Sequence, residues 1–145
     1  MLQRFESFVS GITVCYKYIQ RIKAMEMTEL GLKGTHVMCL FFLYRHEDGL
    51  TATELCRMCT EDKAAISRTL STLREKGCIQ SEGNAYRAKW TLTEQGRAVT
   101  DRVCKLVDQW VGSGGEGLTE DDREVFYKVL EHISANLRKS YEGLE

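Results

Sequence analysis

The sequence predicts a mainly α-helical protein that carries one small β-hairpin. Three observations favour this fold class. The chain has no proline among its 145 residues, long segments place apolar residues at helical spacing, and one stretch alternates apolar and polar residues. A composition of 43% hydrophobic and 28% charged residues is ordinary for a globular domain with a core. No apolar run is long enough to span a membrane and no secretory signal is visible, so we expect a cytoplasmic protein.

The N-terminal third predicts two helices of different character. From Leu2 to about Met27, apolar residues recur at steps of three and four, which is typical of a long amphipathic helix. The stretch "TELGLKG" interrupts this pattern with two glycines. The next segment, "THVMCLFFLYRH" (residues 35–46), is apolar nearly throughout, and we expect a helix that is buried on most sides.

Two shorter helices joined by a tight turn follow. Thr51 and Glu54 form a capping-box pattern, which predicts that a short helix begins there. The stretch "TEDKAAISRTLSTLREKG" (residues 60–77) predicts a second helix, with an inner stripe of Ile66, Leu70 and Leu73, that Gly77 should end. This arrangement is typical of a helix-turn-helix, although other small helical bundles share it.

A β-hairpin is expected in "CIQSEGNAYRAKWTLT" (residues 78–93). "SEGN" is a turn signal, and apolar residues then alternate at Tyr86, Ala88, Trp90 and Leu92. Alternation places Arg87 and Lys89 on the opposite face of the hairpin. A helix-turn-helix followed by a basic hairpin is a winged helix, and the hairpin is its wing.

The C-terminal part predicts two further amphipathic helices. Thr93 can cap the first, and Thr119 can cap the second. Between them, "GSGGEG" (residues 112–117) is the only stretch that predicts flexibility. We therefore divide the chain into an N-terminal dimerisation helix and linker (1–34), a winged-helix core (35–92) and C-terminal dimerisation helices (93–145), which form one structural domain. The terminal helices would either pack on one another or be covered by a second copy of the chain, and we favour a homodimer.

The outer face of the helix over residues 63–75 points to a function. This face carries small residues, hydroxyls and one arginine, where a solvated helix usually mixes long acids and bases. A helix that enters the major groove of DNA, about 12 Å wide, must avoid acids and long neutral side chains. The residues with this character are Ala64, Ala65, Ser67, Arg68, Ser71 and Thr72, and Thr51, Lys63, Arg87 and Lys89 extend the surface. Alternatively, the helix packs in a protein interface and Arg68 forms a salt bridge.

Charge supports the same segment without deciding the matter. The chain has a net charge of −1. From Lys63 to Lys89, however, six bases face two acids, a local balance of +4. The middle of the chain could therefore meet a polyanion. No base–nucleophile pair, phosphate loop or complete metal motif is legible, so we expect no enzyme, no cofactor and no metal, although Cys56 and Cys59 form one C-x-x-C.

The central segment also resembles a known family. "TATELCRMCTEDKAAISRTLSTLREKGCI" followed by "LTEQGR" is similar to the winged-helix core of MarR-type transcriptional regulators. No single element is specific, but the joint order and spacing are. The residues in matching places are Asp62, Lys63, Ser67, Arg68, Leu73, Gly77, Ile79, Leu92, Thr93 and Gly96.

The resemblance implies a homodimer, held by the first and last two helices, that binds a pseudo-palindromic DNA operator and usually represses transcription. It also implies control by a small aromatic ligand, by oxidation of a cysteine or occasionally by a metal. One departure concerns the wing, where the family normally carries Asp-x-Arg. Here the corresponding places read Asn84, Ala85 and Tyr86, so a minor-groove contact by Arg87 is expected less firmly than a major-groove contact by Arg68.

Two regulatory hypotheses follow from the resemblance. In the first, an aromatic ligand binds between the dimer helices and the DNA-binding lobe, with Phe8, Tyr16, His36 and Trp110 as lining residues; plain core packing is the alternative for each of them. In the second, Cys15 is a sensor, because it lies on the first helix as the peroxide-sensing cysteine does in the OhrR-like branch. A protein–protein interaction module that does not bind DNA stays open as a third interpretation.

Overall fold

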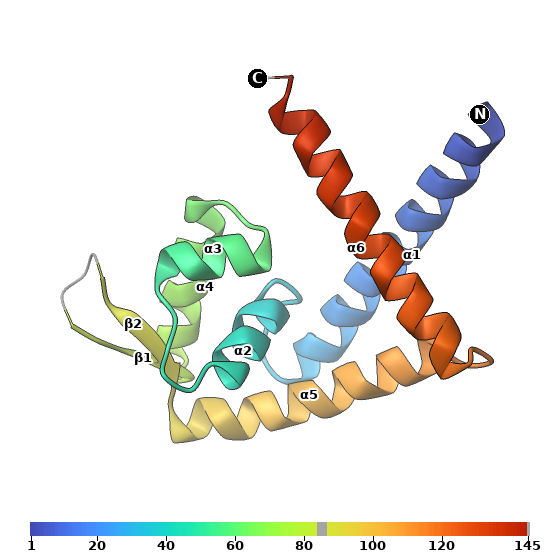
Figure 1. Cartoon of the computed structure of the whole chain (residues 1–145). Coiled ribbons are helices and arrows are strands. Elements are labelled where there is room, and N and C mark those ends of the chain that lie inside the picture. Colours follow the sequence, from blue (N-terminus) through green and yellow to red (C-terminus); the bar gives the residue numbers. More distant parts are fainter. Residues whose placement is uncertain (84–86, 145) are drawn as a thin grey trace. The chain divides into compact units, whose positions relative to one another are not determined.

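The computed structural model describes residues 1–83 and 87–144 and forms two compact units, Met1–Leu106 and Val107–Glu145 (Figure 1). The described residues form α1 (Leu2–Glu29), α2 (His36–Arg45), α3 (Ala52–Cys59), α4 (Lys63–Glu75), β1 (Ile79–Glu82), β2 (Lys89–Leu92), α5 (Glu94–Gly114) and α6 (Glu120–Glu142). The mainly α fold with one hairpin is confirmed. The expected division into residues 1–34, 35–92 and 93–145 assigns a dimerisation or DNA-binding role to each part, and it stays a prediction.

The first helix is long and exposes most of its apolar face. Phe5, Ile12 and Ile19 are all exposed on α1, and the helix becomes buried only near its end, at Met27. The backbone amide of Leu32 donates to the carbonyl oxygen of Met27, which folds the chain back toward α2. The amphipathic pattern therefore predicted the helix correctly, and its stripe remains available to another surface.

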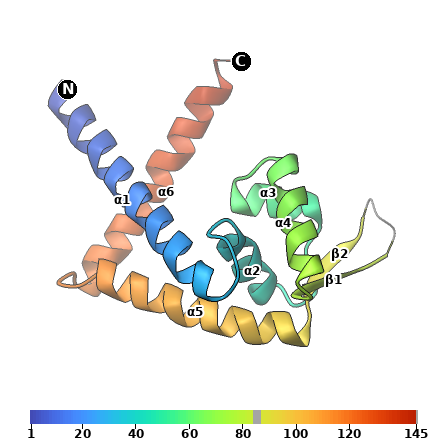
Figure 2. The same cartoon turned by 180° about the vertical axis from the view of Figure 1, so that it is seen from behind.

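The second helix forms the centre of the winged-helix core. α2 packs against α3, α4 and β2, and Figures 1 and 2 show it beside all three from opposite sides. His36, Val37, Cys39, Leu40 and Leu43 are buried along it. This burial explains why its sequence is apolar nearly throughout, as predicted.

The helix-turn-helix forms as the capping pattern predicted. The Thr51 hydroxyl accepts the backbone amide of Glu54, and the Glu54 carboxylate accepts the amide of Thr51 at 2.8 Å. Asp62 caps α4 by accepting the amide of Ala65 at 2.7 Å. Between the helices, Thr60 adopts a left-handed conformation with φ of 56°, which is unfavourable for a β-branched residue.

The inner face of α4 anchors this helix to the core. Ile66, Leu70 and Leu73 are buried, as the spacing predicted, and Thr69 is buried beside them. Burying three such apolar side chains contributes roughly 5–9 kcal/mol. The chain then turns at Gly77, whose φ of +70° favours glycine.

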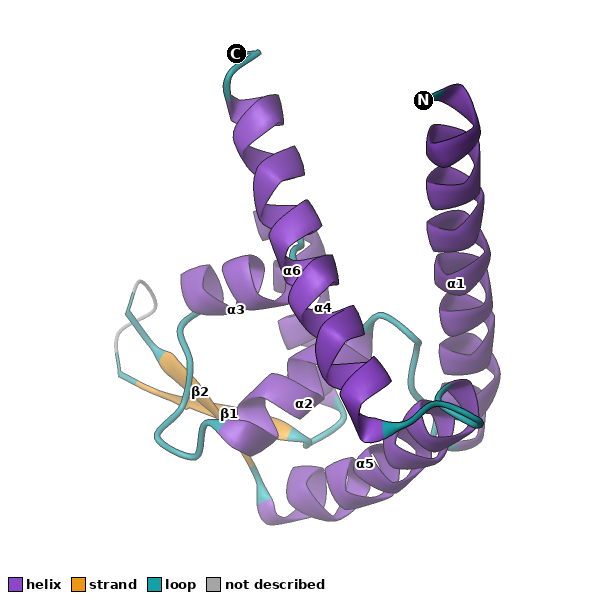
Figure 3. Ribbon diagram, turned by 45° about the vertical axis from the view of Figure 1, so that its right-hand side comes forward, coloured by secondary structure: helices purple, strands orange, loops and turns teal. Residues whose placement is uncertain are grey.

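The wing is a two-stranded antiparallel hairpin that is joined to the start of α3. Ile79 pairs with Leu92 and Glu82 with Lys89, and Figure 3 shows both strands in orange. Trp90 forms a second bridge with Leu50, in which each amide donates to the other carbonyl at 3.0 and 2.8 Å. The alternation is confirmed at Ala88, Trp90 and Leu92, while the expected turn residue Asn84, with Ala85 and Tyr86, lies outside the described residues.

A close backbone contact fixes the junction between the wing and α5. The Thr93 hydroxyl accepts the amide of Gly96 and donates to the carbonyl oxygen of Gly77, so the predicted cap is present. At Gly96 the helix lies so near the preceding turn that a Cβ atom would meet the carbonyl oxygen of Cys78 at 1.7 Å. Only glycine fits at this position.

The glycine-rich stretch differs from its prediction. α5 continues through Gly112, Ser113 and Gly114, so the first half of the expected flexible stretch is helical. The helix continues because the ladder runs on to Gly115, whose amide donates to the carbonyl oxygen of Val111 at 3.0 Å. The amide of Leu118 then donates to the carbonyl oxygen of Gly115, which closes the turn.

The second unit consists of the end of α5 and the whole of α6. Thr119 and Asp122 form a complete capping box at the start of α6, as Thr119 alone was predicted to do. Arg123 donates from Nη2 to the carbonyl oxygen of Gly115 at 3.0 Å and ties the helix to the turn before it. Apolar residues along α6 are exposed, including Val125, Phe126, Val129 and Leu137.

Candidate nucleic-acid interface

A groove of about 870 Å³ lies between α3, α4 and the wing. Its hydroxyl-bearing lining residues come from two helices: Thr51 and Thr53 belong to the start of α3, and Ser67 and Ser71 to α4. Its apolar floor includes Leu70 and Trp90. Six of the ten predicted DNA-binding residues line this groove, namely Thr51, Lys63, Ser67, Ser71, Arg87 and Lys89.

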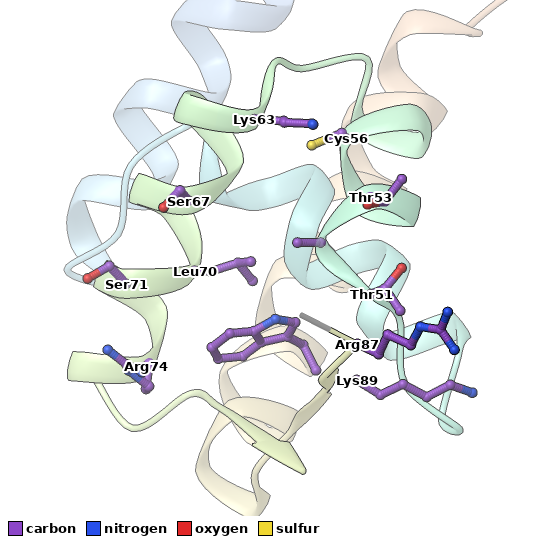
Figure 4. Close-up of a pocket in the computed structure, with 12 residues that line it drawn as sticks. Thr51, Thr53, Cys56, Lys63, Ser67, Leu70, Ser71, Arg74, Arg87 and Lys89 are labelled. Atoms are coloured by element: carbon purple, nitrogen blue, oxygen red, sulfur yellow. The ribbon is translucent and has the colours of Figure 1, made fainter. Parts of the chain in front are cut away.

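Four cations surround the groove. Figure 4 shows Lys63 near the start of α4 and Arg74 near its end, while Arg87 and Lys89 come from the wing side. The groove lining, all of it in residues 51–74 and 87–90, includes no acid. A hollow that carries four positive charges and several hydroxyls attracts a polyanion and can donate hydrogen bonds to it.

The carboxylate of Glu54, at the edge of this surface, accepts hydrogen bonds within the cap of α3. Glu54 accepts from the amide and the hydroxyl of Thr51 at 2.8 and 2.9 Å. These hydrogen bonds, with smaller contributions from Lys89 and Arg57, hold the pKa of Glu54 below its usual range. Glu54 is therefore engaged in the cap of α3, and a second acid beside the groove, Glu75, accepts the hydroxyl of Ser71 at 3.2 Å.

The remaining predicted residues of α4 lie on its front and its other flank. At 100° per residue, Ala64 and Arg68 lie opposite the buried stripe. Both are exposed. Ala65, Arg68 and Thr72 line a second, smaller cavity of about 150 Å³. The predicted surface therefore covers both flanks of α4, and its small residues leave the front of the helix open to close approach.

Six groove residues lie outside the predicted DNA-binding set: Ala52, Thr53, Cys56, Leu70, Arg74 and Trp90. Thr53 and Cys56 face α4 only because of the way α3 packs on it, and no local pattern reveals that packing. Arg74 lay on the flank of the predicted helix and carried the required charge, so the spacing could have found it. Trp90 was assigned to the inner face of the hairpin, and its half-buried side chain also contributes to the groove floor.

The predicted ligand-pocket residues lie in different environments. His36 is buried at the start of α2, where its Nδ1 accepts the amide of Lys33 at 3.1 Å. Phe8 and Tyr16 are exposed on α1, and Trp110 is half-buried in the second unit. His36 lines the smaller cavity, whose lining includes none of the other three. The pocket formed by these four residues stays a prediction.

The cysteines are free thiols in varied surroundings. Cys15 is exposed on α1. Burial raises the pKa of the Cys39 thiol to about 12 and that of Cys59 to about 11. Within residues 1–83 and 87–144, no group of three or more His, Cys, Asp or Glu side chains could hold a metal ion, and no helix is long and apolar enough to cross a membrane.

Comparison with known proteins connects this geometry to one family. A model described as the MarR family matches residues 30–87, which contain α4 and most of the residues that line the groove. No curated protein sequence matches the chain.

Solved structures match over most of the chain. A MarR-family transcriptional regulator from Silicibacter pomeroyi is 25% identical with a TM-score of 0.77, and the match covers 86% of each chain. A MarR regulator from Methanosarcina mazei Go1 is 21% identical with a TM-score of 0.81, over 92% of this chain and 91% of the other. A putative MarR-family regulator from Listeria monocytogenes, crystallised with a 26mer DNA, is 19% identical with a TM-score of 0.80, over 91% and 89%. The chain therefore has the fold of MarR-family transcriptional regulators, and its central segment matches the model of that family.

Proposed function

We propose that the protein is a sequence-specific DNA-binding transcriptional regulator and not an enzyme. The observation that carries this proposal is the groove between α3, α4 and the wing, with four cations and no acid among its lining residues in the described chain. The Listeria regulator was crystallised with DNA, and a shared fold supports the same activity here.

In this proposal α4 enters the major groove with its front face. Ala64 and Ala65 allow close approach to the base edges, and Ser67 can donate to bases or phosphates, as Ser71 can once its hydroxyl leaves Glu75. Arg68 can make a bidentate contact with guanine or hold a phosphate. Arg87 and Lys89 would place positive charge against the DNA backbone beside the wing.

The protein would act in the cytoplasm as a homodimer. The first and last helices carry apolar stripes that are exposed in the single chain, at Phe5, Ile12, Val125 and Phe126 among others. A two-fold dimer would place two copies of α4 about 34 Å apart, one turn of DNA, and match a pseudo-palindromic operator. Removing residues 1–20 should then abolish tight operator binding; a truncated monomer that binds as tightly as the full chain would contradict the dimer.

A binding assay with DNA from upstream of the protein's own coding region tests the proposed contacts. Arg68→Ala should weaken binding by about 1–3 kcal/mol and relax specificity, because it removes a base or phosphate contact. Arg102→Ala removes an exposed arginine of α5 and serves as the matched control. Unchanged binding by Arg68→Ala would move the DNA surface elsewhere.

The wing contact has a different signature in the same assay. Lys89→Ala should weaken binding to all sequences alike and lower the salt slope by about one unit, since one phosphate contact is lost. A salt slope equal to that of the parent would contradict a phosphate contact by Lys89.

We propose repression that is released by a small aromatic ligand, with oxidation at Cys15 as the alternative. A ligand needs only differential affinity for the DNA-incompetent state: a hundredfold preference corresponds to about 2.7 kcal/mol. Exposure of Cys15 on α1 supports the alternative, since a sensor thiol must be accessible. Operator binding is measured after peroxide and after salicylate, in the parent and in Cys15→Ser. If peroxide releases the parent from DNA but not Cys15→Ser, control by oxidation at Cys15 is favoured. If salicylate releases both proteins from DNA, control by a small aromatic ligand is favoured.

A further inference from the structure

We propose that the smaller cavity on the flank of α4 away from the wing binds a phosphate group of the DNA backbone. The inference rests on the proposed DNA-binding function and adds a site to it. The cavity measures about 150 Å³ and is formed by the end of the α1–α2 loop, the first residue of α2, the turn before α4 and the outer flank of α4. Its polar lining residues are Lys33, Thr35, His36, Glu61, Arg68, Thr69 and Thr72.

His36 lines this cavity with a side chain that is largely buried. The residue is 2% exposed, and its Nδ1 accepts the backbone amide of Lys33 at 3.1 Å. Nδ1 must therefore be unprotonated, which leaves the ring hydrogen on Nε2. Within the described residues, Nε2 has no hydrogen-bond partner. Among the described residues, Nε2 of His36 is not one of the buried side-chain atoms that lack a partner, so it keeps access to solvent and could donate to a ligand in the cavity that His36 lines.

Three hydroxyls and two cations surround the same space. The structure of residues 1–83 and 87–144 records no hydrogen bond from the side chains of Thr35, Thr69 or Thr72. Lys33 and Arg68 add positive charge. The N-terminal amides of α2 are not available, because those of His36 and Val37 donate to Lys33 and Gly34. The cavity therefore offers side-chain donors to an acceptor.

One acid lies among these donors and does not reverse the charge. Glu61 borders the cavity, and its charge acts on Lys23 of α1, where it offsets part of the lowering of the Lys23 pKa that burial causes. The lining includes two cations, Lys33 and Arg68, and one carboxylate, Glu61, so its net charge is positive. A cavity well above the volume of one water, about 30 Å³, lined by hydroxyls, an imidazole N–H and cations, fits a compact oxyanion such as a phosphodiester.

The position of the cavity selects DNA as the source of that phosphate. Arg68 lies both on the front of α4 and in the lining of the cavity. If the front of α4 occupies the major groove, about 12 Å wide, each flank of the helix faces one sugar-phosphate strand. The groove with the four cations faces one strand, and the cavity beside His36 then faces the other.

A scan with neutral backbone linkages tests this assignment. Single methylphosphonates replace successive phosphates of the operator, and binding is measured for the parent, His36→Asn and Thr72→Val. Asparagine can accept the Lys33 amide through its side-chain oxygen but removes the Nε2 donor, while Thr72→Val keeps the shape and removes a hydroxyl. His36→Gln, which can restore a donor near Nε2, is the matched control.

We expect one phosphate in each half-site whose methylphosphonate weakens the parent about tenfold. The same linkage should weaken His36→Asn and Thr72→Val by much less, since their contact is already reduced. Equal losses for parent and variants at every position would overturn the phosphate site while leaving the proposed function intact. A parent that binds no unmodified DNA would overturn both.

A second arm separates DNA from a free anion. Inorganic phosphate is added to the protein without DNA, and thermal unfolding of the parent and Thr72→Val is compared. The proposal expects no difference between their responses at millimolar phosphate. Selective stabilisation of the parent, together with equal losses in the methylphosphonate scan, would assign the cavity to a free anion and overturn the backbone contact.

Discussion

Gly96→Ala should destabilise the junction between the wing and α5 far more than an alanine substitution in a helix usually does. The added Cβ would lie 1.7 Å from the carbonyl oxygen and 2.6 Å from the carbonyl carbon of Cys78. Since packed heavy atoms sit about 3.5 Å apart, the two backbones must separate by roughly 1.5 Å or more. Both groups belong to the main chain, so no rotamer change relieves the clash.

The separation would also weaken the hydrogen bonds that close the junction. The amide of Thr93 donates to the carbonyl oxygen of Cys78 at 3.0 Å, and the amide of Gly96 donates to the Thr93 hydroxyl at 2.9 Å. Overpacking alone costs about 1–3 kcal/mol, and with these hydrogen bonds we expect a loss of about 3 kcal/mol. In a domain of this length the loss should lower the melting temperature by roughly 10 °C.

Thermal and urea unfolding, followed by circular dichroism at one protein concentration, measure this loss. Gly112→Ala is the control, because it lies in the same helix and a Cβ there would meet nothing within 4 Å. It should leave stability unchanged or raise it by up to about 1 kcal/mol. A melting temperature of Gly96→Ala within about 2 °C of the parent would refute the steric argument.

Three further predictions concern the winged-helix core. Thr60→Asn should raise the free energy of unfolding by about 0.5–1 kcal/mol, since asparagine tolerates the left-handed conformation better than a β-branched residue; a lower urea midpoint would contradict this. Thr51→Ala should cost about 1 kcal/mol in the same assay by removing the cap of α3, and no loss would show that the capping box contributes little. Burial, then the charges of Lys33 and Lys76, lowers the pKa of His36. The unfolded chain therefore binds a proton at His36 more readily than the folded chain does. The free energy of unfolding is highest above the unfolded pKa of about 6.5 and decreases as the pH falls below it. Between pH 7.5 and 5.5 the urea midpoint of the parent should therefore fall more than that of His36→Asn.

Local patterns in the sequence predicted the elements but not all of their contacts. The spacing of Ile66, Leu70 and Leu73 predicted the buried face of α4, because helical period and burial are linked within one segment. The caps at Thr51 and Thr119 were equally local. The contact of Gly96 with Cys78 joins two segments, so no periodicity could reveal it, although the family resemblance placed a glycine there.

The candidate site was predicted in part for the same reason. Charge and residue size along α4 predicted Lys63, Ser67 and Ser71 as DNA-binding candidates, and the structure places all three along the groove. Thr53 and Cys56 join them only through the packing of α3 on α4, which is a tertiary property. Gly112, Ser113 and Gly114 show the converse, because composition predicted a flexible segment and the hydrogen-bond ladder of α5 continued through its first half.

The backbone bridge between Leu50 and Trp90 has a consequence for how the protein would leave DNA. Leu50 immediately precedes the cap of α3, and Trp90 lies in the wing, so the two hydrogen bonds couple the wing mechanically to the helix-turn-helix. If the proposed regulator is released by a signal from the proposed dimerisation helices, the two hydrogen bonds should make the wing and the helix-turn-helix move together. Contacts of α4 and of the wing would then break in one cooperative step, and dissociation from the operator would follow a single exponential.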